Sequence, residues 1–346
     1  MMENNNSESE LQNKNIWQGK RILGIKPKKN IMVWVAIIIV IIVASLFFKW
    51  TSNYFGNWFS GSDQYVSTSP NIAVLYVEGA IMSTSVDSFQ IPVGYQHQWT
   101  LTQIDVLIND PYNKAIMIVI NSPGGGVYES DELYLKLKEY HDQTGRPIYS
   151  TMGSMAASGG YYIATASDKI YANRNTWTGS IGVTIGTFYD ISEFLAKNGV
   201  KTRTINSGTN KAMGSMTDPM TAEQLSIFQS LVNEAYEQFV GIVAKERKMD
   251  LSVVKKLADG RIYTAKQALS NGLVDAIGTK EEAMSDLVAT HKLSDCEIIE
   301  LTYTDNSFLG KLLSSKLPSL PMSDTSAILQ MVNSSRHMPI SYTFAW

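Results

Sequence analysis

The serine at position 158 stands among the smallest residues in the chain. It follows Ala156 and Ala157 and precedes Gly159 and Gly160. Neighbours this small let another molecule approach the hydroxyl closely, and the glycines allow a sharp turn that leaves a backbone N–H beside it. An isolated segment of this composition is also typical of a tight turn packed against a helix. Ser158 is therefore a candidate nucleophile whose assignment depends on the rest of the chain.

A nucleophilic hydroxyl needs hydrogen-bond donors for the oxyanion that its attack creates. A glycine-rich segment at 121–126 directly follows an apolar run at 115–120 that is typical of a strand. Successive glycines after a strand end can present backbone N–H groups in a row. The segment lacks the Gly-Lys-Ser/Thr ending of a phosphate-binding loop. We therefore expect the N–H groups of Gly125 and Gly159 to form an oxyanion hole.

The hydroxyl also needs a base. Histidine is the usual one, but none of the four histidines lies in a Gly- or Ser-rich turn. Lysine serves as a base where burial lowers its pKa enough for it to accept a proton. Lys211 is a candidate because small residues flank it within 205–215, after a predicted strand at 202–205. Taken alone, its surroundings favour an ordinary surface lysine.

Alternating strand-like and helix-like segments predict an α/β fold. The predicted strands lie at 72–77, 115–120, 147–150 and 170–171, and the predicted helices at 101–108, 131–140 and 221–248. Apolar residues recur at three- and four-residue steps from Leu225 to Val243, which predicts ordinary core packing for the longest helix. The sequence shows no internal repeat, so we expect one catalytic unit.

An uncharged apolar run precedes this unit. Residues 31–48 form 18 such residues, which span about 27 Å as a helix and so cross the hydrocarbon core of a bilayer. Basic residues are concentrated before the run, at positions 20, 21, 26, 28 and 29, whereas Lys49 alone follows closely. This asymmetry predicts a cytoplasmic N-terminus. The run lacks a small-x-small cleavage site, so we expect a retained anchor and not a cleaved signal peptide.

The composition argues against nucleic-acid binding and against a metal site. The net charge is −3, and the basic residues form no stripe, so we expect no nucleic-acid partner. Cys296 is the single cysteine, and the four histidines lack metal-ligand spacing, so we expect no metal site. The expected division is a basic cytoplasmic segment at 1–30, a transmembrane anchor in the lipid at 31–50, a linker at 51–70, a catalytic domain at 71–305 and a C-terminal tail at 306–346.

Four ordered motifs resemble the signal peptide peptidase A family. They are Asn-Ser-Pro-Gly-Gly-Gly at 121–126, Gly-Ser-Met-Ala-Ala-Ser-Gly-Gly-Tyr-Tyr at 153–162, Thr-Gly-Ser-Ile-Gly-Val at 178–183 and Ser-Gly-x-x-Lys at 207–211. The likeness extends from about residue 71 to 285. It implies a membrane-anchored serine peptidase with a Ser–Lys dyad, on a fold of repeated ββα units like that of Clp-type proteases and crotonases.

The resemblance also implies roles for single residues. Ser158 would be the nucleophile, Lys211 the general base, and Ser180 would orient the lysine ammonium by a hydrogen bond. Gly125 and Gly159 would supply the oxyanion hole, with no metal or organic cofactor. Family members with two fused copies of the domain divide serine and lysine between the copies, whereas this chain carries both in one. The resemblance therefore implies a ring-like homo-oligomer in which the lysine can reach the serine of a neighbouring subunit.

The expected activity is an extracytoplasmic serine endopeptidase, held at the cell membrane by a single pass, that degrades remnant signal peptides and other apolar peptides. One alternative is a stomatin-operon-type membrane peptidase that acts on a membrane-protein partner. Another is a crotonase-like acyl-CoA enzyme or a non-catalytic scaffold, which would need neither Ser158 nor Lys211. The apolar end of the tail, 338–346, is expected to lie along the substrate groove as an extended strand.

Overall fold

The computed structural model describes residues 67–83, 94–303 and 341–343. The predicted anchor at 31–50 lies outside these ranges. Over the part of the chain that is described, no helix combines the length and the apolar character needed to cross a bilayer.

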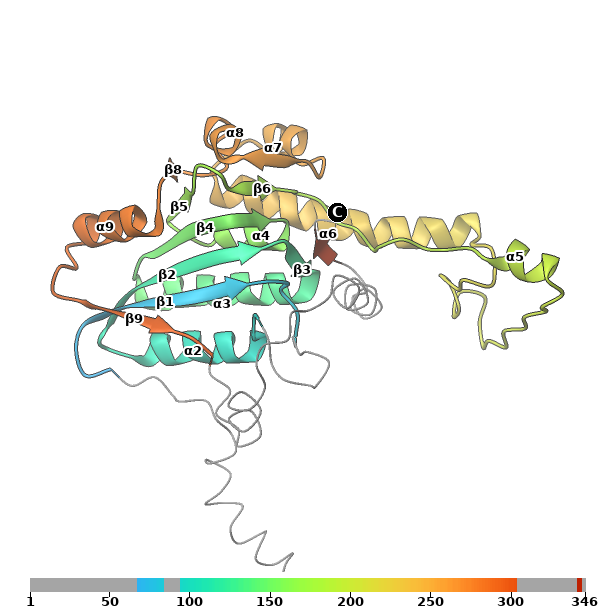
Figure 1. The fold of residues 1–346 in the computed structure, drawn as a ribbon, viewed down its shortest axis with the longest axis horizontal. Coiled ribbons are helices and arrows are strands. Elements are labelled where there is room, and N and C mark those ends of the chain that lie inside the picture. Colours follow the sequence, from blue (N-terminus) through green and yellow to red (C-terminus); the bar gives the residue numbers. More distant parts are fainter. Residues whose placement is uncertain (1–66, 84–93, 304–340, 344–346) are drawn as a thin grey trace, which may run out of the picture. The chain divides into compact units, whose positions relative to one another are not determined.

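Eight strands form one sheet among the described residues, with β5 and β8 beside a main path ordered β7–β6–β4–β2–β1–β9 (Figure 1). The strands are β1 (Asn71–Glu78), β2 (Asn113–Ser122), β4 (Ile148–Ala157), β5 (Lys169–Ala172), β6 (Trp177–Gly179), β7 (Ile262–Thr264), β8 (Ala276–Ile277) and β9 (Glu297–Leu301). Their pairs are parallel except for β6 with β7. The predicted α/β class is confirmed, while repeated ββα units stay a prediction.

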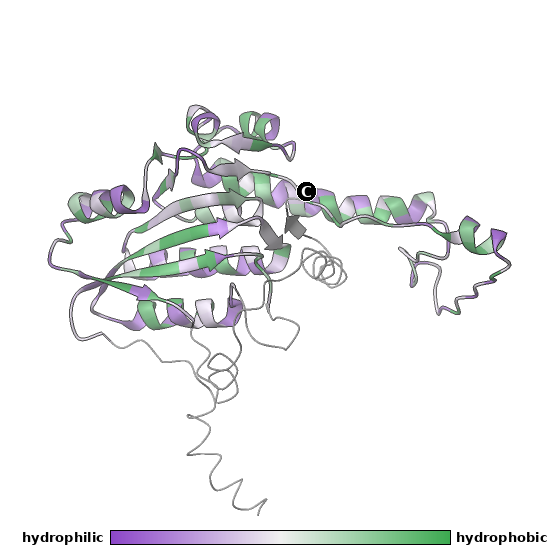
Figure 2. Cartoon of the chain, in the orientation of Figure 1, coloured by the Kyte–Doolittle hydropathy of each residue, from purple (hydrophilic) through white to green (hydrophobic). Residues whose placement is uncertain are grey.

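Helices pack on both faces of the sheet. The helices are α2 (His97–Asn109), α3 (Val127–Thr144), α4 (Gly159–Ala164), α5 (Ser192–Lys197), α6 (Ala222–Glu246), α7 (Leu251–Leu257), α8 (Ala265–Ser270) and α9 (Lys280–His291). In β1, Ala73 and Leu75 join the core cluster that includes α2, α3, α4 and α6, while Ile72 and Val74 join the one that includes α9. Because both faces are buried, β1 and β2 are apolar along most of their length (Figure 2).

A second, two-stranded sheet lies beside the glycine-rich segment. Strand β3 (Gly124–Gly126) pairs in antiparallel fashion with β10 (Ser341–Thr343), so that Tyr342 lies opposite Gly125. The other edge of β3 meets Ile81: the Ile81 N–H donates to Gly124 O at 2.9 Å, and the Gly126 N–H donates to Ile81 O at 2.9 Å. Residues 341–343 therefore lie next to the glycine-rich segment for which the sequence predicts an oxyanion-hole N–H.

The longest helix is buried over only half of its length. Thr221 starts α6 with a capping box, in which its side chain accepts from the Gln224 N–H. The buried residues of α6 all lie in its C-terminal half, from Ala235 to Val243. The apolar periodicity of the sequence predicts that Leu225 and Leu231 are buried in the core, but these side chains are 55% and 38% exposed. The prediction of ordinary core packing is therefore wrong for the first half of α6.

That exposed half belongs to a longer segment, residues 182–234, which contains no buried residue; we call it the arm. It runs from the end of β6 through α5 and back along α6 (Figure 1). The predicted strand at 202–205 is absent, since these residues have no regular secondary structure. Outside the arm, Leu135 on α3 is another exposed apolar side chain, at 55%.

Candidate active site

Parallel strands bring the predicted site residues to one edge of the sheet. In β1, β2 and β4 the chain runs in the same direction, so that their carboxyl ends lie together. The glycine strand β3 follows β2 almost directly, and Ser158 follows β4. Ligands of open α/β sheets bind beyond the carboxyl ends of the strands. This edge is therefore the place where the fold favours a reaction.

Ser158 occupies a strained turn between β4 and α4. Its backbone has φ 55° and ψ −117°, a conformation that is rare for a residue with a side chain. Two hydrogen bonds hold it: the Ser158 N–H donates to Gly179 O at 2.8 Å, and Ser158 O accepts from the Tyr162 N–H at 2.9 Å. In α/β-hydrolases, a strained strand-to-helix turn of this kind presents the nucleophile.

The glycine strand has no room for side chains. A Cβ on Gly125 would lie 1.8 Å from Ile81 O, and Gly124 has φ 101°. The Gly124 C=O and the Gly126 N–H form hydrogen bonds with the backbone of Ile81 at one edge of β3. The N–H and C=O of Gly125 therefore face the other edge, where β10 lies. Gly125 can therefore offer its N–H to an extended peptide at that edge.

The two glycines of the expected oxyanion hole lie in contact. A Cβ on Gly159 would lie 3.1 Å from the Gly125 nitrogen and 2.4 Å from Ser130 Oγ. Gly126 is the N-cap of the 18-residue helix α3, whose positive end is therefore directed at the same place. The structure brings Ser158, Gly125 and Gly159 together.

Ser180 lies beside the candidate nucleophile. Strands β4 and β6 are paired in register at Ala157 and Gly179, so that Ser158 and Ser180 follow neighbouring strand ends. Ser180 also has a left-handed backbone, with φ 50°, and its N–H donates to Arg261 O at 2.8 Å. Both serines are buried, with exposed fractions of 1% and 6%.

Lys211 does not meet these serines within one chain. It is exposed on the arm, where Thr209 O accepts from Gln224 Nε2 and Asn210 Nδ2 donates to Glu223, both in the first turn of α6. Helix α4 contacts α6 much farther along, at Gln238. The 15 residues between positions 223 and 238 correspond to about 22 Å of helix. Among the described residues, no side-chain hydrogen bond joins Ser158, Ser180 and Lys211.

The two tyrosines that follow Ser158 serve packing. Tyr161 and Tyr162 are fully buried, and burial raises the pKa of Tyr161 above its usual range. The Tyr162 hydroxyl donates to Asp131 at 2.6 Å and accepts from Gln238 at 2.9 Å. Sequence reasoning missed this connection of α4 to α3 and α6, because an apolar-looking Tyr-Tyr pair carries no sign of its polar partners.

Comparison with known proteins places these motifs in a family. The sequence profile described as Peptidase family S49 matches residues 141–294, a range that includes both serines and Lys211. The putative signal peptide peptidase SppA of Enterococcus faecium is 40% identical over 251 residues, which cover 72% of each chain. The chain belongs to the signal peptide peptidase A family.

Other relatives of this signal peptide peptidase A family member are named as proteases. A putative protease of Synechocystis is 42% identical over 169 residues, covering 49% of this chain and 60% of its own. Protease 4 of Salmonella typhi is 34% identical over 226 residues, covering 65% of this chain and 35% of its own. The family and the names of these relatives support a protease activity.

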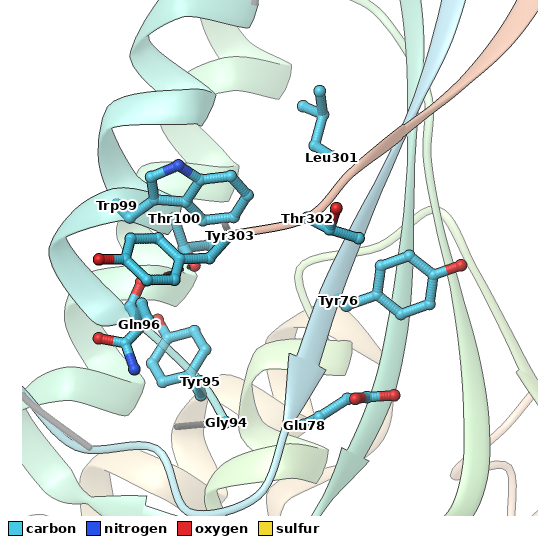
Figure 3. A pocket seen from close by; sticks show the side chains of 10 residues that line it. All are labelled: Tyr76, Glu78, Gly94, Tyr95, Gln96, Trp99, Thr100, Leu301, Thr302 and Tyr303. Atoms are coloured by element: carbon cyan, nitrogen blue, oxygen red, sulfur yellow. Dashed lines mark hydrogen bonds between the residues drawn. The ribbon is translucent and has the colours of Figure 1, made fainter. Parts of the chain in front are cut away.

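A pocket of about 330 Å³ lies at the carboxyl ends of β1 and β9 and is separate from Ser158 in the sheet order (Figure 3). Four of its ten lining residues are aromatic, and two of these, Trp99 and Tyr303, meet edge to face with ring centroids 5.9 Å apart. None of the predicted site residues lines it. Within the described ranges, no group of three His, Cys, Asp or Glu side chains is placed to hold a metal.

Proposed function

We propose that this family member is a serine endopeptidase with Ser158 as its nucleophile and Lys211 as its general base. The observation that carries the proposal is the strained backbone of Ser158 beside Gly125 and Gly159 at the carboxyl edge of the sheet. A strained, buried serine next to the backbone N–H groups of Gly125 and Gly159 suits attack on a carbonyl and has no evident structural purpose.

The proposed reaction has two halves. Ser158 Oγ attacks the peptide carbonyl carbon while its proton passes to the neutral amine of Lys211. The N–H groups of Gly125 and Gly159 hold the oxyanion. The C–N bond then breaks as the lysine ammonium returns the proton to the leaving amine, and water hydrolyses the acyl-enzyme by the same path. In this proposal, Ser180 accepts a hydrogen bond from the ammonium and directs it to Ser158.

The base is proposed to come from a second copy of the chain in a ring-like homo-oligomer. Lys211 is exposed in the single chain, whereas a lysine acts as a base only where burial lowers its pKa. The arm that carries it has no buried residue yet displays large apolar side chains, among them Phe194 at 66% and Ile205 at 90% exposure. An apolar surface of this kind is typical of a protein interface. A neighbour's core would cover the arm and desolvate the lysine.

The substrate is proposed to bind as an extended strand along β3. The described segment β10 already pairs with this edge, opposite Gly125, and so shows that the edge accepts a strand. Backbone hydrogen bonds of this kind do not read side chains, so they suit the varied sequences of apolar peptides. The tail is proposed to compete with substrate for the edge.

The cellular setting is proposed from the sequence and the family. Residues 31–50 would anchor the chain in the membrane lipid, with 1–30 in the cytoplasm, 51–70 as a linker, and the peptidase domain at 71–305 on the outer side. Its substrates there would be remnant signal peptides and other apolar peptides, which are cut close to the membrane. The name of the Enterococcus faecium relative, a putative signal peptide peptidase, supports this substrate class.

The test is cleavage of an apolar fluorogenic peptide by the purified full chain and by its Ser158→Ala and Lys211→Ala variants. Both variants should be inactive alone. Because the proposed dyad joins two subunits, mixing the two inactive variants before assembly should restore part of the activity. Full activity in either variant alone would contradict the Ser–Lys dyad. A mixed assembly that regains no activity would contradict the proposal that the two residues come from different subunits.

A further inference from the structure

Ser130 carries a hydroxyl that the proposed mechanism does not use. It lies in the first turn of α3, four residues after Gly126, and is fully buried. Within the described part of the chain, its Oγ is the one buried side-chain oxygen or nitrogen without a hydrogen-bond partner. Burying an unpaired hydroxyl costs free energy. A buried hydroxyl without a partner in a folded protein therefore needs a functional explanation.

The Ser130 hydroxyl lies where α3, β3 and the start of α4 meet, beside the two glycines of the proposed oxyanion hole; we call this place the seam. Ser130 Oγ is 2.4 Å from the place that a Cβ on Gly159 would take, and the Gly125 nitrogen is 3.1 Å from that same place. The Gly124 Cα also approaches it, at 3.2 Å. Ser130 thus reaches Gly159 from the same side as β3 does.

Two other buried hydroxyls near this edge, those of Ser122 and Thr178, are paired. Ser122 Oγ accepts from the Gly124 N–H at 3.0 Å, and Thr178 Oγ1 donates to Ala156 O at 2.6 Å. Farther away, Ser150 Oγ bonds to Ser167 Oγ at 2.5 Å. The fold therefore gives these three buried hydroxyls a partner, whereas the Ser130 hydroxyl in the seam beside Gly159 has none.

We propose that Ser130 is a positioning residue of the oxyanion hole, whose free hydroxyl supports the negative charge that forms beside Gly125 and Gly159. This inference rests on the proposed peptidase function. A hydroxyl hydrogen rotates freely about its C–O bond. Before the reaction nothing near Ser130 accepts it. When the oxyanion forms, the dipole turns toward the charge in a setting that excludes water, where such interactions are strong.

An interaction that arises only in the transition state lowers the barrier without tightening substrate binding. A residue that only fills space would behave differently, because loss of its oxygen would change packing and stability but not kcat. The two explanations therefore separate in the Ser130→Ala variant, which keeps the Cβ and removes the oxygen.

The experiment measures kcat, KM and the thermal unfolding midpoint of the full chain carrying Ser130→Ala, with an apolar fluorogenic peptide as substrate. We expect kcat to fall about 5- to 30-fold, less than the 10²- to 10³-fold loss typical of a direct oxyanion donor. KM should stay within about twofold, and the midpoint should hold or rise, because an unpaired buried hydroxyl is removed. Binding of an apolar peptide boronic acid, which mimics the tetrahedral state, should weaken in parallel with kcat.

Ser150→Ala is the matched control, since it removes a buried but paired serine hydroxyl. Its midpoint should fall because Ser167 loses its partner, while the kcat of the folded protein should not change. If Ser130→Ala does not fold, Ser130→Cys keeps the size with a weaker donor and should give an intermediate loss of kcat.

A wild-type kcat in folded Ser130→Ala would overturn the inference, as would a loss confined to KM or to stability. Such a result would leave the proposed function intact if Ser158→Ala is inactive. Cleavage that persists in Ser158→Ala would instead overturn the proposed function, and this inference with it.

Discussion

Ser158 and Ser180 follow the ends of two paired parallel strands, and both have a left-handed backbone, with φ 55° and 50°. The Ser158 N–H donates to the carbonyl of Gly179, directly before Ser180. Neighbouring strands lie about 5 Å apart, so the two hydroxyl-bearing residues are adjacent although 22 positions separate them in the sequence. Each strained serine is held by a hydrogen bond from its own N–H to a carbonyl on the next strand or loop.

The two serines should differ in what they contribute. Ser158→Ala should lower kcat at least about a thousandfold because the nucleophile is lost. Ser180→Ala should lower it about 10- to 100-fold, since it disturbs only the orientation of the base. Steady-state cleavage of an apolar peptide measures both. Ser154→Ala, on the exposed face of β4, is the control and should be fully active. Equal losses at positions 158 and 180 would contradict the division of roles.

The arm should be needed for assembly. Ile205→Asp places a charge on a side chain that is 90% exposed in the single chain. If a second copy covers it, the charge should be desolvated there and shift the assembly toward monomers, with a parallel loss of activity. Sedimentation velocity and peptide cleavage measure the two effects. Leu135→Asp, at an exposed site on α3, should change neither. A monomer with full activity would contradict the shared site.

The sequence predicted the sheet and the site edge well, because their signals are local. An apolar run followed by Asn-Ser-Pro-Gly or by Ser-Gly-Gly marks a strand end wherever the strand lies. The sequence predicted the structure of the arm poorly. The apolar stripe of α6 from Leu225 to Val243 is continuous, and periodicity does not reveal whether the same chain or another one covers it. Ser130 left no signal at all, since only the packing of α3 on Gly159 distinguishes it from other serines.

The tail should compete with substrate. Deletion of residues 338–346 removes β10 from the edge of β3 and frees the N–H of Gly125. We expect a lower KM for an apolar peptide with kcat unchanged within about twofold, because the substrate no longer displaces a strand. The deletion should be measured in a fully assembled sample, which size-exclusion chromatography verifies. Unchanged cleavage kinetics in that sample would count against the proposed competition.

Glu246 should make the attachment of α6 sensitive to acid. Its burial opposes ionisation, but the hydrogen bond from Tyr134 and the charge of Lys138 outweigh that effect, so its pKa lies below the usual value. A carboxyl group with a lowered pKa stabilises the fold above its unfolded-state pKa of about 4.3, and this stability is lost as the pH falls through the lower folded-state value.

Chemical denaturation between pH 7 and pH 3 measures this contribution. Glu246→Gln should lower the free energy of unfolding at pH 7 and flatten its decline in acid. Glu297→Gln is the control, an exposed carboxyl on β9 whose removal should leave the slope as in the wild type. Parallel curves for wild type and Glu246→Gln would contradict this reading of the pKa.

The central claim is that Ser158 Oγ forms the covalent intermediate. The most direct measurement is to treat the assembled chain with an apolar peptide fluorophosphonate and locate the adduct by mass spectrometry. The account predicts one adduct per active chain, on the peptide that contains Ser158, and none in the Ser158→Ala variant. An adduct on Ser180 or another residue, or cleavage that continues without Ser158, would contradict it.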